Sequence, residues 1–310
     1  MELIGRHRRG APAYSHHCDV PRRSLRPAAT PVLSMTLAPF QTHLRRWSLT
    51  PDGDPIVTPS SRLLAVRQRG VPAMLKIALE KEERFGSGLM VWWDGDGAAS
   101  VLAHDGDALL MERATGTRSL ETLARAGEDD EASRIICAIA DRLHAPRSKA
   151  LPELIPLERW FEALLHAAPS HGGVVQQASD TARALLADQQ EIAVLHGDLH
   201  HGNVLDFGAK GWLAIDPKRL FGDRCFDYAN IFCNPDAICF ERNAPVATSP
   251  GRLARQAHVV AKAARIERTR LLKWILAYSG LSALWSLEDN QPADLALKIM
   301  EIAAAEIARG

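Results

Sequence analysis

The chain has 310 residues, of which 46% are hydrophobic and 24% charged, so it can form two packed lobes of an ordinary globular enzyme. Its formal net charge is zero, which gives no basis for expecting nucleic-acid binding. No apolar run reaches the roughly eighteen residues of a membrane span, so we expect no membrane association.

The five cysteines, at positions 18, 137, 225, 233 and 239, form no Cys-X-X-Cys pair. They are typical of reduced thiols in a cytosolic protein, and we expect a cytoplasmic location. A zinc site made by Cys225, Cys233 and Cys239 with a nearby histidine stays open as an alternative.

Residues 1–34 carry six arginines and four prolines and show no hydrophobic periodicity. The prolines would break an amphipathic helix, so we expect a disordered extension and not a transit peptide. A translation start assigned too early would explain the segment, with Met35 as the start of the folded chain. The remaining residues carry 31 basic and 35 acidic side chains, a mild surplus that would suit a cationic substrate.

Residues 35–113 predict a strand-rich lobe with one helix. The candidate strands are Arg46–Leu49, Arg62–Val66, Pro72–Ile77, Ala99–Ala103 and Ala108–Glu112, with turn and loop residues between them. The candidate helix begins among Glu80, Glu82 and Glu83 and runs to Trp93. Lys76 lies on the third strand between apolar neighbours.

Residues 114–310 predict a mostly helical lobe. The expected helices are Leu120–Ala126, Ala132–Leu143, Trp160–Ala167, Val174–Leu186, Leu253–Ala264, Arg268–Ser286 and Ala293–Ile307. Between the fourth and fifth of these lies a segment with a different character, in which polar residues follow two short apolar runs.

That segment reads His-Gly-Asp-Leu-His-His-Gly-Asn-Val-Leu from His196 to Leu205, and Trp-Leu-Ala-Ile-Asp ends at Asp216. Phosphoryl transfer needs such a set: one Asp to orient a hydroxyl, and an Asn and a second Asp to hold Mg²⁺ on nucleotide phosphates. Asp198, in a loop after an apolar run, can accept the proton of an incoming hydroxyl. Asn203 and Asp216 offer hard oxygen ligands for Mg²⁺.

The string resembles the catalytic loop of the aminoglycoside phosphotransferases, with which choline and fructosamine kinases share close variants. The likeness continues at Gly222-Asp223 and at Phe226-Asp-Tyr-Ala-Asn230. Three further strings, Trp92-Trp-Asp-Gly95, Ala108–Ala114 and Tyr278–Trp285, resemble the streptomycin 6-phosphotransferase and hydroxyurea-resistance branch. The resemblance covers about residues 40–305 and implies an α+β, protein-kinase-like fold of two lobes.

The resemblance also implies roles for residues outside the loop. Lys76 would contact the α- and β-phosphates of ATP and pair with Glu83. The segment Glu112, Arg113 and Ala114 would be the hinge that reads adenine, and Ser60 and Ser61 would contact phosphate, because the chain has no GxGxxG loop. His196 and Asp227 would support the catalytic loop.

The expected activity is ATP- and Mg²⁺-dependent phosphorylation of streptomycin at its 6-hydroxyl, by a monomer or weak homodimer. A polycationic substrate needs carboxylates near Asp198 and a surface on which guanidinium groups can stack. The candidates are Asp236, Glu241, Trp285, Glu288 and Asp289.

Other activities stay open. The acceptor could be hydroxyurea or the hydroxyl of another small metabolite. A two-metal phosphoesterase could use the Asp and His clusters, but it would leave Lys76 and the hinge unexplained. A pseudokinase would bind nucleotide without chemistry, and the presence of Lys76, Asp198, Asn203 and Asp216 argues against it.

Overall fold

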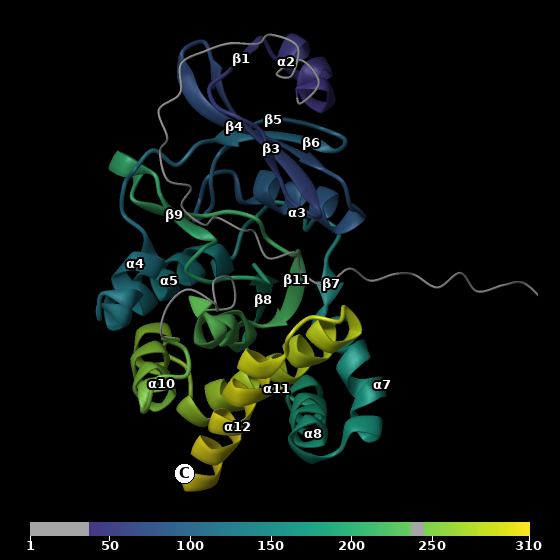
Figure 1. Cartoon of the computed structure of the whole chain (residues 1–310), viewed down its shortest axis with the longest axis vertical. Coiled ribbons are helices and arrows are strands. Elements are labelled where there is room, and N and C mark those ends of the chain that lie inside the picture. The colour runs from purple at the N-terminus through teal and green to yellow at the C-terminus, as the bar shows by residue number, and fades with distance from the viewer. Residues whose placement is uncertain (1–36, 237–244) are drawn as a thin grey trace, which may run out of the picture.

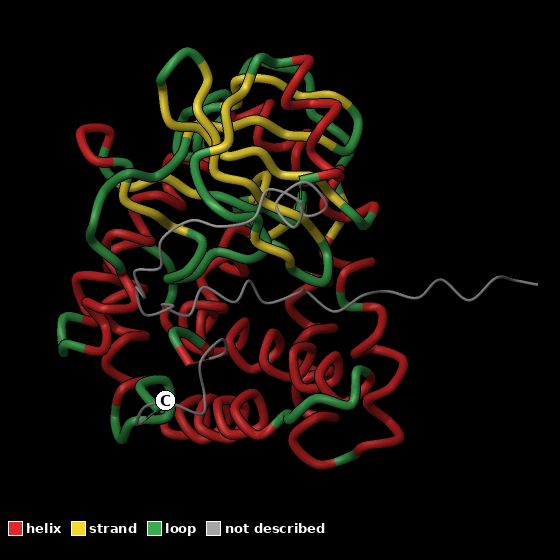
Figure 2. Tube along the Cα trace, turned by 45° about the horizontal axis from the view of Figure 1, so that its top comes forward, coloured by secondary structure: helices red, strands yellow, loops and turns green. Residues whose placement is uncertain are grey.

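The computed structural model describes residues 37–236 and 245–310. The expected disordered extension, residues 1–34, and two of the singled-out residues, Cys239 and Glu241, lie outside the described ranges. The molecule has an upper lobe built on a sheet and a lower lobe of helices, which confirms the α+β, two-lobe fold expected from the sequence (Figure 1). Figure 2 shows the same division, with strands gathered in one lobe and helices in the other.

The upper lobe is a six-stranded antiparallel sheet with strand order β1-β3-β4-β6-β5, and β2 pairs with β3 beside this path. The strands are β1 (Leu49–Pro51), β2 (Ile56–Val57), β3 (Ser61–Gln68), β4 (Val71–Ala78), β5 (Val101–Asp105) and β6 (Ala108–Glu112). In β3, β4 and β6, Leu64, Leu75 and Leu110 are fully buried in the core of this lobe. Helix α3 (Lys81–Trp93) follows β4 directly and lies below the sheet (Figure 1).

One predicted strand of this lobe was wrong. Arg46 ends helix α2 (Gln41–Arg46), which follows the short 3-10 helix η1 (Ala38–Phe40), and β1 begins only at Leu49. Phe40 and Leu44 are buried four residues apart, the spacing that brings side chains onto one helix face. Pro39 near the start of this segment also favours a helical beginning.

In the lower lobe, most of the helices pack against one long helix, α11. Its helices are α4 (Leu120–Arg125), α5 (Asp129–His144), α6 (Leu157–Trp160), α7 (Glu162–His171), α8 (Gly173–Ala187), η3 (Arg224–Cys233), α10 (Arg252–Ala264), α11 (Arg268–Glu288) and α12 (Asp294–Arg309). The predicted helix Trp160–Ala167 is divided into α6 and α7 at Phe161, whose ring is fully buried. In the described parts of the chain, no helix is long and apolar enough to cross a membrane.

Two small sheets lie between the large sheet of the upper lobe and the helices of the lower lobe (Figure 1). Strands β9 (Val204–Asp206) and β10 (Trp212–Ala214) form an antiparallel pair, and β11 (Leu220–Asp223) lies between β7 (Ile155–Pro156) and β8 (Ile192–Leu195). Only part of this arrangement was expected from the sequence. The turns between β8 and β9 and between β10 and β11 carry the polar residues singled out above, so these sheets fix the position of the site.

Candidate active site

The loop from His196 to Asn203 is joined to the segment after β10 by backbone hydrogen bonds. The N–H of Ile215 donates to the carbonyl of Asn203 at 2.9 Å, and the N–H of Lys218 donates to the carbonyl of His196 at 2.6 Å. The two halves of the predicted motif therefore lie side by side, although nine residues separate Leu205 from Ile215 in the chain.

His196 connects the same two segments through its ring. Nε2 lies 2.8 Å from the carbonyl oxygen of Ile215, and the N–H of Asp198 donates to Nδ1 at 3.2 Å. This pattern requires a neutral ring with its proton on Nε2. Burial lowers the pKa of His196 below its ordinary value, against the opposing effect of Asp227 and Asp198, and so favours that neutral form.

Asp227, on η3, fixes the start of the loop by accepting hydrogen bonds from its backbone. Its Oδ2 accepts from the N–H of His196 at 2.8 Å and its Oδ1 from the N–H of Gly197 at 2.7 Å. His144 Nε2, at the end of α5, lies 2.8 Å from Oδ2. Asp227 is buried, and each carboxylate oxygen has at least one partner, so it is placed to support the loop and not to meet a ligand.

Asp198 is oriented by two amides. Asn230 Nδ2 donates to its Oδ1 at 2.7 Å, and Asn203 Nδ2 donates to its backbone carbonyl at 2.8 Å and to its Oδ2 at 3.3 Å. The side chain of Asp198 is 16% exposed, so it remains reachable. Because Asn203 uses its NH₂ group on Asp198, its amide oxygen is left to act as an acceptor or metal ligand.

Lys76 and Glu83 form a buried ion pair, as the resemblance implied, and Lys76 also pairs with Asp216. Burial disfavours the charged form of Lys76, but Asp216 and Glu83 outweigh burial and raise its pKa above the ordinary value. Burial also opposes ionisation of Asp216, yet the two lysines Lys76 and Lys218 lower its pKa well below the usual range. Asp216 is therefore a carboxylate, the form that a divalent cation requires.

A cavity of about 410 Å³ lies between the lobes at this ion pair. Its walls include every residue assigned from the resemblance to nucleotide or metal: Ser60, Ser61, Lys76, Glu83, Glu112, Arg113, Ala114, Asn203 and Asp216. Apolar side chains make up much of the remaining lining: Leu63, Met74, Met90, Leu109, Met111, Leu120, Val204, Leu205, Phe207 and Ile215. A slot with apolar walls and polar groups at one end fits a purine nucleotide and its phosphates.

Ser60 ends the turn between β2 and β3, Ser61 is the first residue of β3, and both line this cavity. Thr58 orders the loop, because its hydroxyl accepts from the N–H of Ser61 at 2.9 Å and lies 3.0 Å from the Ser61 hydroxyl. At the opposite wall, Glu112 Oε1 accepts from the N–H of Ser100 at 2.7 Å and Oε2 pairs with Lys210. Lys210 belongs to the β9–β10 hairpin, so this contact joins that hairpin to the end of β6, where the hinge was expected.

The proposed substrate residues are less well placed. Asp236 is buried, and its Oδ1 pairs with Arg125 at 3.1 Å, which speaks against direct contact with a substrate. Trp285 is half-buried and packs edge-on against Trp160, with ring centroids 5.2 Å apart. Glu288 and Asp289 are exposed beyond it, and neither lines the cavity at Lys76. Contact between substrate and any of these four residues stays a prediction.

Three site residues were not identified from the sequence. Asn230 was quoted only as part of the resemblance string, His144 ends a helix expected for its apolar face alone, and Lys218 follows Asp216-Pro217 without a periodic signal. The side chain of Asn230 contacts Asp198, that of His144 contacts Asp227, and that of Lys218 contacts Glu83. The string Phe226–Asn230 was the available signal for Asn230.

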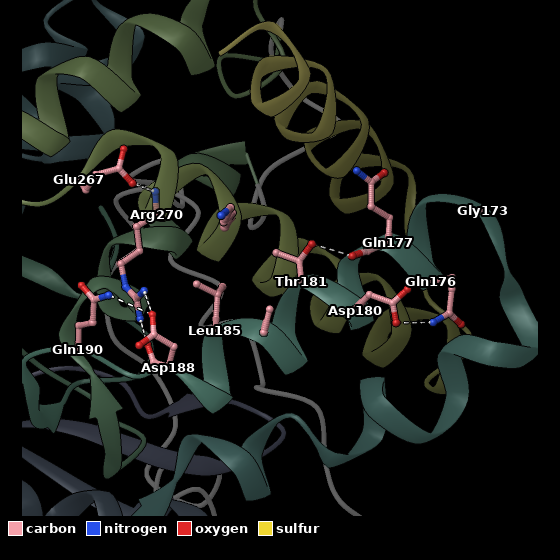
Figure 3. A pocket seen from close by; sticks show the side chains of 12 residues that line it. Gly173, Gln176, Gln177, Asp180, Thr181, Leu185, Asp188, Gln190, Glu267 and Arg270 are labelled. Atoms are coloured by element: carbon pink, nitrogen blue, oxygen red, sulfur yellow. Dashed lines mark hydrogen bonds and ion pairs between the residues drawn. The ribbon is translucent and has the colours of Figure 1, made fainter.

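A second hollow, of about 750 Å³, lies on the helical lobe between α8 and the start of α11 (Figure 3). Its polar groups already have partners: Gln176 donates to Asp180 at 2.8 Å, and Arg270 binds Asp188 and, outside the hollow, Asp223. It contains none of the phosphoryl-transfer residues. In the described ranges, moreover, no three His, Cys, Asp or Glu side chains gather as a metal site would require, and the buried thiols of Cys225 and Cys233 have raised pKa values.

Comparison with known proteins gives a consistent result. A model of the family "Aminoglycoside/hydroxyurea antibiotic resistance kinase" matches residues 46–290. Streptomycin 3''-kinase of Klebsiella pneumoniae is 51% identical over 247 residues, 80% of this chain and 92% of that protein. Streptomycin 6-kinase of Streptomyces griseus is 31% identical over 274 residues, 84% of this chain and 85% of that protein.

Among solved structures, a thermostable mutant of aminoglycoside phosphotransferase APH(4)-Ia, in ternary complex with AMP-PNP and hygromycin B, has the same fold. The TM-score is 0.62 at 16% sequence identity, and the likeness covers 86% of this chain and 97% of that chain. At this identity the likeness concerns the fold alone.

Proposed function

Because the chain belongs to the aminoglycoside/hydroxyurea antibiotic resistance kinases, we propose that it transfers the γ-phosphate of ATP to a hydroxyl of streptomycin. The observation that carries the proposal is that Lys76, Asn203 and Asp216 line one cleft, with Asp198 hydrogen-bonded to Asn203 beside it. Kinases of this family are phosphotransferases that act with ATP and Mg²⁺, and the donor set present here suits both.

In the proposed mechanism, the apolar slot takes adenine and Lys76 moves to the phosphates. Asn203 and Asp216 would hold Mg²⁺, which would neutralise charge on the β- and γ-phosphates. Asp198, fixed by Asn230, would orient the acceptor hydroxyl and take its proton. Asp227 and His196 would keep the loop in position through the backbone contacts described above.

The acceptor hydroxyl that we favour is the 3''-hydroxyl of streptomycin. The 6-hydroxyl, expected from the branch resemblance, is the second candidate. The streptomycin 3''-kinase is 51% identical to this chain, whereas the streptomycin 6-kinase is 31% identical, and this difference sets the order. Glu121 pairs through Oε1 with Arg125 at 3.1 Å, but its side chain is 32% exposed and lines the cleft, so its carboxylate would also be within reach of a guanidinium group.

The direct test is incubation of the purified protein with ATP, Mg²⁺ and streptomycin. We expect a product heavier by one phosphoryl group, and ³¹P–¹H correlation spectroscopy would identify the modified hydroxyl. Hydroxyurea and amino alcohols are the comparison acceptors, and Asp198→Asn protein is the matched inactive control. ATP consumption with another acceptor, but no phosphorylated streptomycin, would retain the kinase and reject the antibiotic.

Expression in a sensitive bacterium gives an independent test. Tolerance to streptomycin should rise more than tolerance to kanamycin, because streptomycin carries guanidinium groups that pair with carboxylates in a planar fork, whereas the amines of kanamycin are compact point charges. A site shaped for one leaves charges of the other unpaired. Equal protection against both drugs would contradict this specificity.

A further inference from the structure

Lys218 is a second buried lysine at the ion pair of the cleft. Its Nζ lies 3.2 Å from Oε1 of Glu83, and its side chain is 6% exposed. The other oxygen of Glu83, Oε2, is bound to Lys76. A single carboxylate on α3 is therefore shared by a lysine from the sheet lobe and a lysine from the helical lobe.

A second contact joins α3 to the segment from Asp216 to Lys218. A Cβ atom built on Gly86 would lie 2.4 Å from the backbone oxygen of Pro217, a distance that no side chain tolerates. A Cβ atom on Gly88, two residues further along α3, would meet nothing within 4 Å. The helix therefore rests against the backbone between Asp216 and Lys218 at Gly86, independently of the Lys218 ion pair.

The two carboxylates at this place, those of Glu83 and Asp216, are matched by an equal number of lysines only when Lys218 is counted with Lys76. Lys76 pairs with both Glu83 and Asp216, and Lys218 is the second lysine beside Glu83. In the proposed function, on which this inference rests, Lys76 turns to the phosphates and Asp216 to Mg²⁺. Glu83 would then keep one cationic partner, Lys218. Without Lys218, Glu83 would have only Lys76 and would hold it away from the nucleotide.

We propose that Lys218 is a positioning residue for phosphoryl transfer. It holds Glu83 and α3 on the Asp216 segment whether or not nucleotide is bound, and it thereby leaves Lys76 free to bind phosphate. The cleft is consequently assembled before the nucleotide arrives, through Lys218 and the close approach at Gly86. Lys218 acts through Glu83 and Lys76 and has no contact with the acceptor.

The first experiment compares Lys218→Met with Lys218→Arg and with the control Lys149→Met, which removes an exposed lysine paired with Asp94. Calorimetry with MgADP needs no acceptor, so its result is independent of streptomycin. We expect Lys218→Met to weaken MgADP binding by about 10- to 100-fold, the usual effect of losing a residue that orients a ligand group. Lys218→Arg should restore part of the affinity, and Lys149→Met should match the wild type.

In steady state, the KM for MgATP should rise in Lys218→Met while the KM for streptomycin stays constant. A residue with a purely structural role would lower the melting temperature and leave the MgADP affinity of the folded protein unchanged, and that result would overturn the proposal. Failure of streptomycin as an acceptor, with the expected MgADP results, would reject the antibiotic and retain the role of Lys218.

The second experiment uses two glycines on the same helix. Gly86→Ala should push α3 from Pro217 and weaken MgADP binding in the same direction as Lys218→Met. Gly88→Ala adds the same methyl group in open space and should bind MgADP as the wild type does, with a slightly higher melting temperature because alanine favours the helix. If Lys218→Met does not fold, the comparison of Gly86→Ala with Gly88→Ala tests the proposal in its place. Equal MgADP affinity in folded Gly86→Ala and Gly88→Ala would overturn the proposal.

Discussion

The side chain of Asn230 donates a hydrogen bond to Oδ1 of Asp198 at 2.7 Å, across 32 residues of chain. Asn230 is itself oriented, because Asn234 Nδ2 donates to its amide oxygen at 3.0 Å. This fixes which end of the Asn230 amide faces the carboxylate. The carboxylate of Asp198 therefore has a defined direction before any acceptor binds.

Asn230→Ala should lower kcat by about 10- to 100-fold, because small misplacement of a catalytic group has effects of that size. The affinity for MgADP should not change, since Asn230 does not line the nucleotide cavity. Stopped-flow or coupled assays would measure kcat, and calorimetry the affinity. A wild-type kcat would show that Asn203 alone suffices to orient Asp198.

Asp198→Asn should reduce turnover by at least about 100-fold, because an amide cannot accept the acceptor's proton. Nucleotide binding should stay near wild type. The substitution keeps the shape of the side chain, so thermal unfolding should report an intact fold. Turnover within tenfold of wild type would remove Asp198 from its proposed role.

Asp216→Ala should abolish the Mg²⁺-dependent part of ATP binding, because the remaining ligand, Asn203, is neutral. Calorimetry with and without Mg²⁺ measures this difference. Asp223 cannot take over, since its carboxylate accepts from Cys225 at 2.9 Å and binds Arg270 at the far end of β11. An undiminished Mg²⁺ effect would mean that the ion binds elsewhere.

Arg252→Met should lower the free energy of unfolding by about 3 kcal/mol, because it leaves the partly buried carboxylate of Asp129 without its bidentate partner. Urea unfolding at pH 7 would measure this change. The control Lys298→Met removes an exposed pair with Glu301 and should cost less than about 0.5 kcal/mol.

The same pair has a pH dependence of known sign. Burial opposes ionisation of Asp129, but His201 and Arg252 outweigh it and lower its pKa to about 2. The carboxylate's contribution is therefore complete above its unfolded pKa and is lost as the pH falls toward 2. Between pH 5 and pH 8 Asp129 should accordingly add no pH dependence to the free energy of unfolding of the wild type, which urea unfolding across that interval would measure; a loss of stability traced to Asp129 above pH 5 would contradict the assignment.

Deletion of residues 1–34 should leave activity and melting temperature unchanged, because that segment has too few apolar residues to pack on a core. A longer deletion, of residues 1–46, is the control. It removes Phe40 and Leu44, which are buried in the core of the sheet lobe, and should lower the melting temperature. A shift of several degrees for the shorter deletion would show that the extension packs on the enzyme.

The sequence by itself determined the parts of the site that lie on one continuous segment. Asp198, Asn203 and Asp216 occur within nineteen positions, and short strands with local pairing hold them, so residue order already implied their proximity. Lys76 could be placed because apolar neighbours mark its strand and the family resemblance fixes its partner. The two-lobe division likewise followed from the change between strand and helix patterns.

Only the tertiary structure decided the contacts between distant segments. Asn230 with Asp198, His144 with Asp227, and Lys218 with Glu83 join residues 32, 83 and 135 positions apart. A polar residue at such a position has no periodic signal, because its partner lies on another element and its burial is compensated only after packing. The same reason applies to Asp236, which is buried and pairs with Arg125, a partner that composition and spacing do not reveal; its contact with substrate stays a prediction.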